Sequence, residues 1–231
     1  MNNEIKSELF SHGVDIVRFV DISNYPIEQT LGFDRAILFC MVLSKKYVAD
    51  FLSGKPFDWN NDEYLYKEKK VEDLADWIAG YIQRKGFRAH SQSDGSNKKS
   101  GYIEQAYIDP EMTQGISILP QKAIARASGL GFIGKNNLLV TEEYGSAITM
   151  CSVLTDAPIT PENFPIIESK CGKCNVCVEK CDANALLGNE WTASRSRDDL
   201  VDVSKCNCAL KCMMECPWTI RYIRELKGGK K

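Results

Sequence analysis

The sequence predicts an α+β protein, with a larger α/β domain over residues 1–165 and a small cysteine-rich domain over residues 166–231. The length of 231 residues suits one mid-sized domain with an appendage. Apolar residues before position 165 follow helix-like spacing in some stretches and strand-like runs in others. Eight of the ten cysteines lie between Cys171 and Cys216, and a proline-rich stretch at 156–165 marks the boundary before them.

The regular elements of the larger domain follow from its apolar patterns. The predicted helices are Glu4–His12, Asp62–Lys85 and Gln121–Ala127. Gly13 and Gly86 follow two of them and supply left-handed stops. The predicted strands are Val14–Val20, Ala36–Leu43 and Phe87–His90. Ala36–Leu43 has almost no polar face, so we expect it to be buried on both sides of a sheet.

Two further expectations concern the stretch between residues 91 and 154. The polar composition of Ser91–Gly101 predicts a surface loop. Leu138–Thr141 and Ala147–Leu154 read as two strands, and the turn-forming residues Glu142–Gly145 between them predict a hairpin.

Composition excludes several classes of protein. The formal net charge is -2, so no overall positive field favours nucleic acid or an anionic membrane. The N-terminus lacks the basic and apolar regions of a signal peptide, and the longest apolar run, Ala36–Leu43, is too short to span a bilayer. We therefore expect a cytoplasmic protein with no membrane partner, in which the ten cysteines do not form disulfides.

The first cysteine run has the spacing C-x2-C-x2-C-x3-C. Its members are Cys171, Cys174, Cys177 and Cys181. Two-residue spacers let a loop fold around one iron–sulfur cube, and the longer last spacer directs the fourth cysteine to a second cube. Zinc is the alternative, but structural zinc sites use two separated pairs of ligands. Four cysteines within eleven consecutive residues favour iron–sulfur clusters.

The second run, C-x-C-x3-C-x3-C-P, completes the ligand count for two [4Fe–4S] clusters. In two-cluster ferredoxins the last cysteine of each run ligates the other cluster. By this rule the first cluster takes Cys171, Cys174, Cys177 and Cys216. The second takes Cys181, Cys206, Cys208 and Cys212. The C-x-C spacing is unusual, and it leaves open whether Cys206 and Cys208 both reach one cube.

The remaining cysteines and the two histidines have a structural explanation. Cys40 and Cys151 lie in apolar stretches, where a thiol behaves as a small hydrophobic group. His12 and His90 are isolated from other ligand types in the sequence, which favours ordinary core or surface positions over metal ligation.

A second dense motif runs from Pro120 to Leu139. Gly129, Gly131 and Gly134 permit a tight turn and close approach of the backbone to a ligand or cluster, and Lys135 adds a positive charge. The pattern does not satisfy the phosphate-binding motif G-x-x-x-x-G-K-S/T. An ordinary glycine-rich turn between a helix and a strand is the alternative.

This run, followed by Tyr144-Gly145-Ser146 and Leu154-Thr155-Asp156, resembles epoxyqueuosine reductases and their reductive-dehalogenase relatives. The segment ending in Cys216-Pro217-Trp218 is similar too. The resemblance implies a nitroreductase-like α/β domain followed by a ferredoxin-like domain, with a cobalamin between them in the reductases. It further implies that five residues line the cluster-facing side of that cavity: Lys122, Gly129, Gly131, Gly134 and Lys135.

One family feature is missing from the sequence. The resemblance implies an aspartate proton donor just upstream of the lysine motif, but that offset reads Gln114-Gly115-Ile116-Ser117. The nearby groups that can carry a proton are Tyr102, Tyr107, Asp109 and Glu111, although ordinary core positions are favoured for the two tyrosines. No catalytic residue is assigned.

Two functions follow from these features. One is an iron–sulfur oxidoreductase resembling epoxyqueuosine reductase, which passes electrons through two [4Fe–4S] clusters to a corrinoid or substrate in the α/β domain. The other is a non-catalytic electron carrier or activator of another redox protein, which the missing aspartate favours and the large α/β domain disfavours. A third hypothesis is that the clusters serve only to stabilise the fold. The expected partners are a low-potential electron donor protein and a small-molecule or corrinoid ligand, with tRNA left open.

Overall fold

The computed structural model describes residues 1–56, 58, 60–99, 119–192 and 194–224. The chain divides into two compact units. Unit 1 comprises Met1–Met41, Tyr64–Ser128 and Thr149–Pro165, and unit 2 comprises Val42–Glu63, Gly129–Ile148 and Ile166–Lys231. Unit 2 therefore takes in two segments besides the cysteine-rich region. The functional division at residue 165 stays a prediction.

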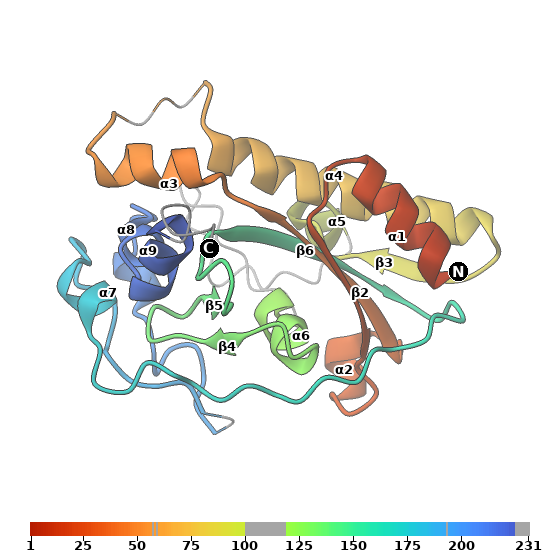
Figure 1. Cartoon of the computed structure of the whole chain (residues 1–231). Helices are drawn as coiled ribbons and strands as arrows, with labels where there is room; N and C mark the ends of the chain where they lie inside the picture. The colour runs from red at the N-terminus through yellow and green to blue at the C-terminus, as the bar shows by residue number, and fades with distance from the viewer. Residues whose placement is uncertain (57, 59, 100–118, 193, 225–231) are drawn as a thin grey trace, which may run out of the picture. The chain divides into compact units, whose positions relative to one another are not determined.

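Unit 1 contains a four-stranded sheet with the strand order β1-β2-β6-β3 (Figure 1). Its strands are β1 (Ile16–Asp21), β2 (Arg35–Val42), β3 (Ala89–Ser91) and β6 (Ile148–Thr155). Its helices are α1 (Asn2–Ser11), α2 (Ile27–Thr30), α4 (Glu63–Arg84), α5 (Asp94–Lys99) and α6 (Gln121–Ala127). β1 pairs with β2 and β3 with β6, in both cases antiparallel. A mixed α+β architecture is confirmed.

The core of unit 1 lies between the sheet and the helices α1 and α4, which cover one of its faces (Figure 1). Ile5 and Leu9 of α1 and Ile78 of α4 are fully buried there against Phe19 and Phe39 of the sheet. Each such side chain contributes about 1.5–3 kcal/mol by leaving water. The six central residues of β2 are all buried, as the lack of a polar face predicts.

The prediction of a surface loop at Ser91–Gly101 was wrong for its described part. Residues 94–99 form helix α5, and Gln92 and Ser93 are almost completely buried. The polar groups are satisfied inside the protein, because Gln92 Nε2 donates to the Leu119 carbonyl and Ser93 Oγ to Asp76. A polar composition predicts a loop only where such internal partners are missing.

Unit 2 is built from short elements. They are α3 (Lys45–Leu52), β4 (Phe132–Ile133), β5 (Leu139–Val140), α7 (Val176–Glu179), the 3₁₀ turn η2 (Val203–Lys205), α8 (Lys211–Met214) and α9 (Pro217–Arg224). β4 and β5 form a small antiparallel sheet in which Phe132 faces Val140 and Ile133 faces Leu139. The turn between these strands carries Lys135 and Asn136.

The predicted hairpin of Leu138–Thr141 with Ala147–Leu154 was also wrong. The turn itself forms, since Thr141 and Gly145 exchange backbone hydrogen bonds of 2.8 and 3.1 Å. The strands on either side of it have different partners, however. β5 pairs with β4, whereas β6 joins the four-stranded sheet. Turn chemistry is local, and it does not determine where the strand after the turn finds its partner.

Cys40, Cys151, His12 and His90 take the structural positions expected of them. Both thiols are fully buried, and burial raises the pKa of Cys40 to about 12. His12 packs on the ring of Trp77, and His90 Nε2 lies 3.0 Å from Asn97 Oδ1. The two cysteines are thus core residues, and the two histidines contact neighbouring side chains.

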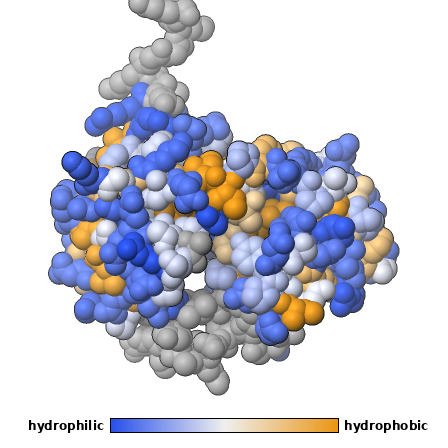
Figure 2. Space-filling model, turned by 90° about the horizontal axis from the view of Figure 1, so that it is seen from below, coloured by the Kyte–Doolittle hydropathy of each residue, from blue (hydrophilic) through white to orange (hydrophobic). Residues whose placement is uncertain are grey.

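None of the helices among the described residues has the length and apolar character needed to cross a bilayer. Figure 2 shows a face on which hydrophilic residues predominate, with hydrophobic patches between them.

A Tyr222→Phe substitution should destabilise unit 2 modestly. The buried Tyr222 hydroxyl donates to the Leu43 carbonyl at 3.0 Å and so ties α9 to the start of α3. Loss of this bond leaves a buried carbonyl unpaired, which costs about 1–2 kcal/mol. Urea unfolding should show the loss, and Tyr66→Phe at a side chain that is 60% exposed should change little. Equal effects of the two variants would contradict the role given to the bond.

Candidate metal centre

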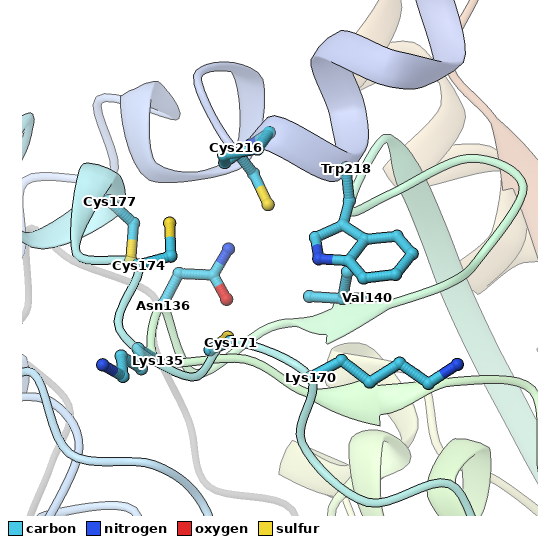
Figure 3. Close-up of a pocket in the computed structure, with 10 residues that line it drawn as sticks. Lys135, Asn136, Val140, Lys170, Cys171, Cys174, Cys177, Cys216 and Trp218 are labelled. Carbon is cyan, nitrogen blue, oxygen red and sulfur yellow. The ribbon is translucent and has the colours of Figure 1, made fainter.

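Four cysteines of unit 2 surround one small cavity. Cys171, Cys174, Cys177 and Cys216 line a space of about 100 Å³ together with Lys135 and Trp218. Figure 3 shows the Cys216 sulfur pointing into the space bounded by Cys174 and Trp218. These are the four cysteines that the crossed-ligation rule assigns to the first cluster.

Local backbone geometry explains why the first run can encircle a space. The Cys174 amide donates to the Cys171 carbonyl at 3.0 Å, and Gly172 between them takes a φ of 52°. The Gly172 amide is held by the Glu190 carboxylate at 2.7 Å. Cys177 then lies on α7. A tight turn followed by a helix places the three thiols on one side of the loop.

Cys216 reaches the same cavity from the other run. It immediately precedes α9, whose first residue is Pro217, a position where the missing N–H of proline costs nothing. The Trp218 ring lies edge-on to Phe132 and beneath the Arg221 guanidinium, with ring contacts of 5.7 and 4.6 Å. The packing of Trp218 fixes the helix start that carries Cys216.

The thiols of this cavity need a positive group to become thiolates together. Burial, and then the neighbouring Cys216, Cys171 and Cys174, raise the pKa of Cys177 to about 11. Iron bound by the sulfurs reverses this penalty, because a metal removes the thiol proton outright. The described residues contain no group of three or more His, Cys, Asp or Glu side chains placed to hold a single ion. The sulfurs ring a space instead, which suits a cube whose irons each take one thiolate.

The other four cysteines gather in a second place. Cys181, Cys206 and Cys212 pack against a small apolar cluster that contains Ala185 and Leu186. Burial, followed by the nearby Cys206, Cys177 and Cys181, raises the pKa of Cys212 to about 12. The structure thus brings together the cysteines predicted for the second cluster. Their role as ligands stays a prediction.

The C-x-C segment folds so that the thiols of Cys206 and Cys208 lie close to each other. Cys208 has a φ of 53° and Leu210 a φ of 57°, both in the left-handed region that non-glycine residues rarely adopt. The Cys208 thiol hydrogen-bonds to Cys206 and thereby lowers the pKa of Cys206 to about 6. The two sulfurs therefore lie within hydrogen-bonding reach of each other.

Ion pairs connect the two cysteine runs. Lys180 lies 3.2 Å from Glu215, and Lys211 lies 2.6 Å from Asp182. Lys180 lies within the first run and Asp182 directly after it, and both of their partners lie in the second run. Such exposed pairs contribute less than about 1 kcal/mol each, so they orient the runs more than they stabilise them.

Part of the glycine-lysine motif has a packing role, in line with the alternative of a glycine-rich turn between a helix and a strand. A Cβ on Gly131 would lie 2.3 Å from the Val140 carbonyl oxygen, and one on Gly134 would lie 2.5 Å from Asn136 Oδ1. Gly131 is thus required by the backbone of the β4–β5 hairpin, whereas a side chain at position 134 would have to displace the side chains of Asn136 and Val140. Gly129, with a φ of 65°, precedes this hairpin in unit 2, whereas Lys122 lies on α6 of unit 1.

Lys135 and Asn136 reach both cysteine runs. Lys135 Nζ donates to the Gly172 carbonyl at 2.8 Å and to Asn175 Oδ1 at 2.9 Å, both within the first run. Asn136 Nδ2 donates to the Cys212 carbonyl at 3.0 Å, in the second run. Asn136 was not among the predicted site residues. A lone asparagine has no spacing signal, and only its position beside Lys135 could have suggested it.

An Asn136→Asp substitution should loosen the second run. A carboxylate cannot donate to the Cys212 carbonyl, and it would place two oxygen acceptors against each other. We expect faster loss of iron when the protein is exposed to a chelator. Asn184→Asp, at an exposed asparagine three residues after Cys181, is the control and should release iron as the unchanged protein does. Unaltered release from the Asn136 variant would show that this bond does not hold the run.

The candidate proton carriers Tyr102, Tyr107, Asp109 and Glu111, and the offset at residues 114–117, lie outside the described residues. No catalytic acid is therefore assigned.

Comparison with known proteins identifies the likeness. No family model matches the chain. The chain is 32% identical over 92 residues to epoxyqueuosine reductase of Staphylococcus aureus, a match that covers 39% of this chain and 24% of the relative. It is 27% identical over 145 residues to the Pseudomonas aeruginosa enzyme, which covers 62% of this chain and 32% of that one. The chain resembles the epoxyqueuosine reductases. The matches span less than a third of the lengths of these two relatives.

Solved structures extend the likeness to the fold of nearly the whole chain. Epoxyqueuosine reductase from Streptococcus thermophilus has a TM-score of 0.57 at 17% identity, covering 95% of this chain and 66% of that one. An epoxyqueuosine reductase with a modified tRNA stem loop gives 0.55 at 16% identity, covering 95% and 65%. A reductive dehalogenase described as B12-dependent gives 0.64 at 20% identity, covering 96% and 33%. At these identities the comparison supports a shared fold.

Proposed function

We propose that this chain is an iron–sulfur oxidoreductase of the epoxyqueuosine reductase type. The observation that carries the proposal is the cavity ringed by Cys171, Cys174, Cys177 and Cys216, which come from two separate runs. A second group of four cysteines beside it supplies ligands for a second cluster. The resemblance to reductases favours an enzyme over a simple electron carrier.

The residues present fit two [4Fe–4S] clusters, which supply one-electron transfer when bound. Cys171, Cys174, Cys177 and Cys216 would hold one, and Cys181, Cys206, Cys208 and Cys212 would hold the other. The meeting of the Cys206 and Cys208 thiols supports the view that both are ligands. Apolar residues pack around Cys181 and Cys212 and would shield that side of the second site, whereas Cys208 is exposed.

The proposed electron acceptor is inferred from the proteins that this chain resembles. By likeness to the B12-dependent dehalogenase and to the tRNA-bound reductase, we propose a corrinoid as the electron acceptor and tRNA as a macromolecular partner. A nitroreductase-like fold for unit 1 and a ferredoxin-like fold for the cysteine-rich region belong to the same proposal. Gly131 and Gly134 face packed protein atoms, so these two glycines offer no open cradle for a corrinoid, and we derive no step through one.

Anaerobic titration with cob(II)alamin tests the acceptor. We expect binding of one corrinoid per chain, seen as a change in the cob(II)alamin absorption and EPR spectra, and reduction of its cobalt after dithionite has reduced the protein. No binding, together with transfer of electrons to an added carrier protein, would contradict the reductase proposal and favour the carrier.

A further inference from the structure

Lys135 is a buried cation beside the first cysteine cavity. Its side chain is 6% exposed and lines the cavity with Cys171, Cys174, Cys177 and Cys216. Lysine is almost never buried unless a partner compensates its charge. The groups that the Lys135 ammonium contacts should therefore account for its burial.

The partners of Lys135 are neutral. Its two hydrogen bonds go to the Gly172 carbonyl and the Asn175 side-chain oxygen, and none of the ion pairs within the described part of the chain includes it. Both acceptors belong to the loop that carries Cys171, Cys174 and Cys177. The buried positive charge thus contacts the cluster-binding loop through neutral groups, and the Glu190 carboxylate, which accepts the Gly172 amide, forms no ion pair with it among the described residues.

A positive charge at this place changes the energy of a bound cluster. A cluster held by four thiolates is negative, and it becomes more negative by one charge when it takes up an electron. A nearby cation stabilises the reduced form more than the oxidised form, and low exposure keeps water from screening the difference. The charge therefore raises the reduction potential.

We propose that Lys135 sets the reduction potential of the first cluster, by holding a fixed positive charge against its binding loop. This inference rests on the proposed function, because it needs the cluster to be present. It makes Lys135 a positioning residue for the electron-transfer site, in place of the corrinoid-cavity role that the family resemblance implies.

A redox titration followed by EPR tests the proposal. Lys135→Gln removes the charge and keeps a hydrogen-bond donor. At a fixed solution potential we expect the ratio of reduced to oxidised first cluster to fall about tenfold, a shift of about 59 mV for a one-electron couple. The second cluster serves as an internal reference, and its potential should move less.

Two matched variants separate charge from structure. Lys173→Gln removes the same charge from an exposed side chain of the same loop, where solvent screens it, and should leave the potential almost unchanged. Lys135→Arg keeps the charge and should restore most of the potential. An unshifted potential in Lys135→Gln with full iron content, or an equal shift in Lys173→Gln, would overturn the inference.

A third variant covers the case in which Lys135→Gln loses its iron. Asn175→Asp leaves Lys135 in place and sets a carboxylate against its ammonium group, so the local charge is cancelled without loss of the lysine. The potential of the first cluster should again fall, and an unchanged value would refute the role of Lys135. Absence of iron from the unmodified protein would instead remove the proposed function.

Discussion

Alanine in place of Cys171 is expected to remove about half of the iron that the protein binds. Cys171 is one of the four cysteines around the first cavity, and it is half-buried at the start of the loop, so its loss disturbs little packing. A cube that loses one of its four thiolates leaves an iron open to water. Iron and sulfide per chain, with the EPR spectrum of the reduced protein, measure the loss.

Cys40→Ala provides the matched control for this prediction. It makes the same chemical change at a thiol buried in the sheet of unit 1. We expect full iron content and a loss of about 1–2 kcal/mol in the free energy of unfolding. Retention of all iron by the Cys171 variant, or equal losses in both variants, would mean that the cavity is not a cluster site.

Gly145→Ala should be the most destabilising of the proposed substitutions. Gly145 has a φ of 59°, and a Cβ there would lie 2.3 Å from the backbone nitrogen of Thr219 and 2.6 Å from its Cα. Backbone atoms cannot move aside as a flexible side chain can. The left-handed conformation costs about 1–2 kcal/mol for a non-glycine residue, and overpacking adds about 1–3 kcal/mol. We expect a loss of about 3 kcal/mol, measured by urea unfolding.

The same substitution should also weaken the first cluster site. Thr219 lies on α9 three residues after Cys216, and its hydroxyl accepts the Ser146 amide at 3.0 Å. Displacement of Thr219 would move the start of α9, which directly follows Cys216, a proposed cluster ligand. Gly54→Ala is the control, because Gly54 has a φ of 80° with nothing within 4 Å of a new Cβ. It should show the conformational cost alone and keep its iron; a similar loss in both variants would exclude the clash as the cause.

Elements with a strong local pattern could be predicted from the sequence. α4 is found at Glu63–Arg84 against the predicted Asp62–Lys85, and α6 at Gln121–Ala127 as predicted. Both depend on apolar spacing within one segment. The pairing of β5 depends on contacts outside its own segment: only glycine at position 131 leaves room for the backbone of Val140, and no local pattern contains that information.

The site divides in the same way between local and distant information. The grouping of the cysteines followed from spacing, because metal ligands carry their chemistry in the residue type itself. The role of Asn136 could not be predicted from spacing, because its partner Cys212 lies 76 residues away and is contacted through its backbone. The charge environment of Lys135 likewise depends on burial and on the neutrality of its partners, which the motif alone does not specify.

The iron and acid-labile sulfide content of the anaerobically purified protein tests the central claim most directly. Two [4Fe–4S] clusters predict about eight iron atoms and about eight sulfides per chain, with the EPR signals of two clusters after reduction. About four of each would leave only one cluster. One or two zinc ions without sulfide would contradict the claim that these eight cysteines serve electron transfer.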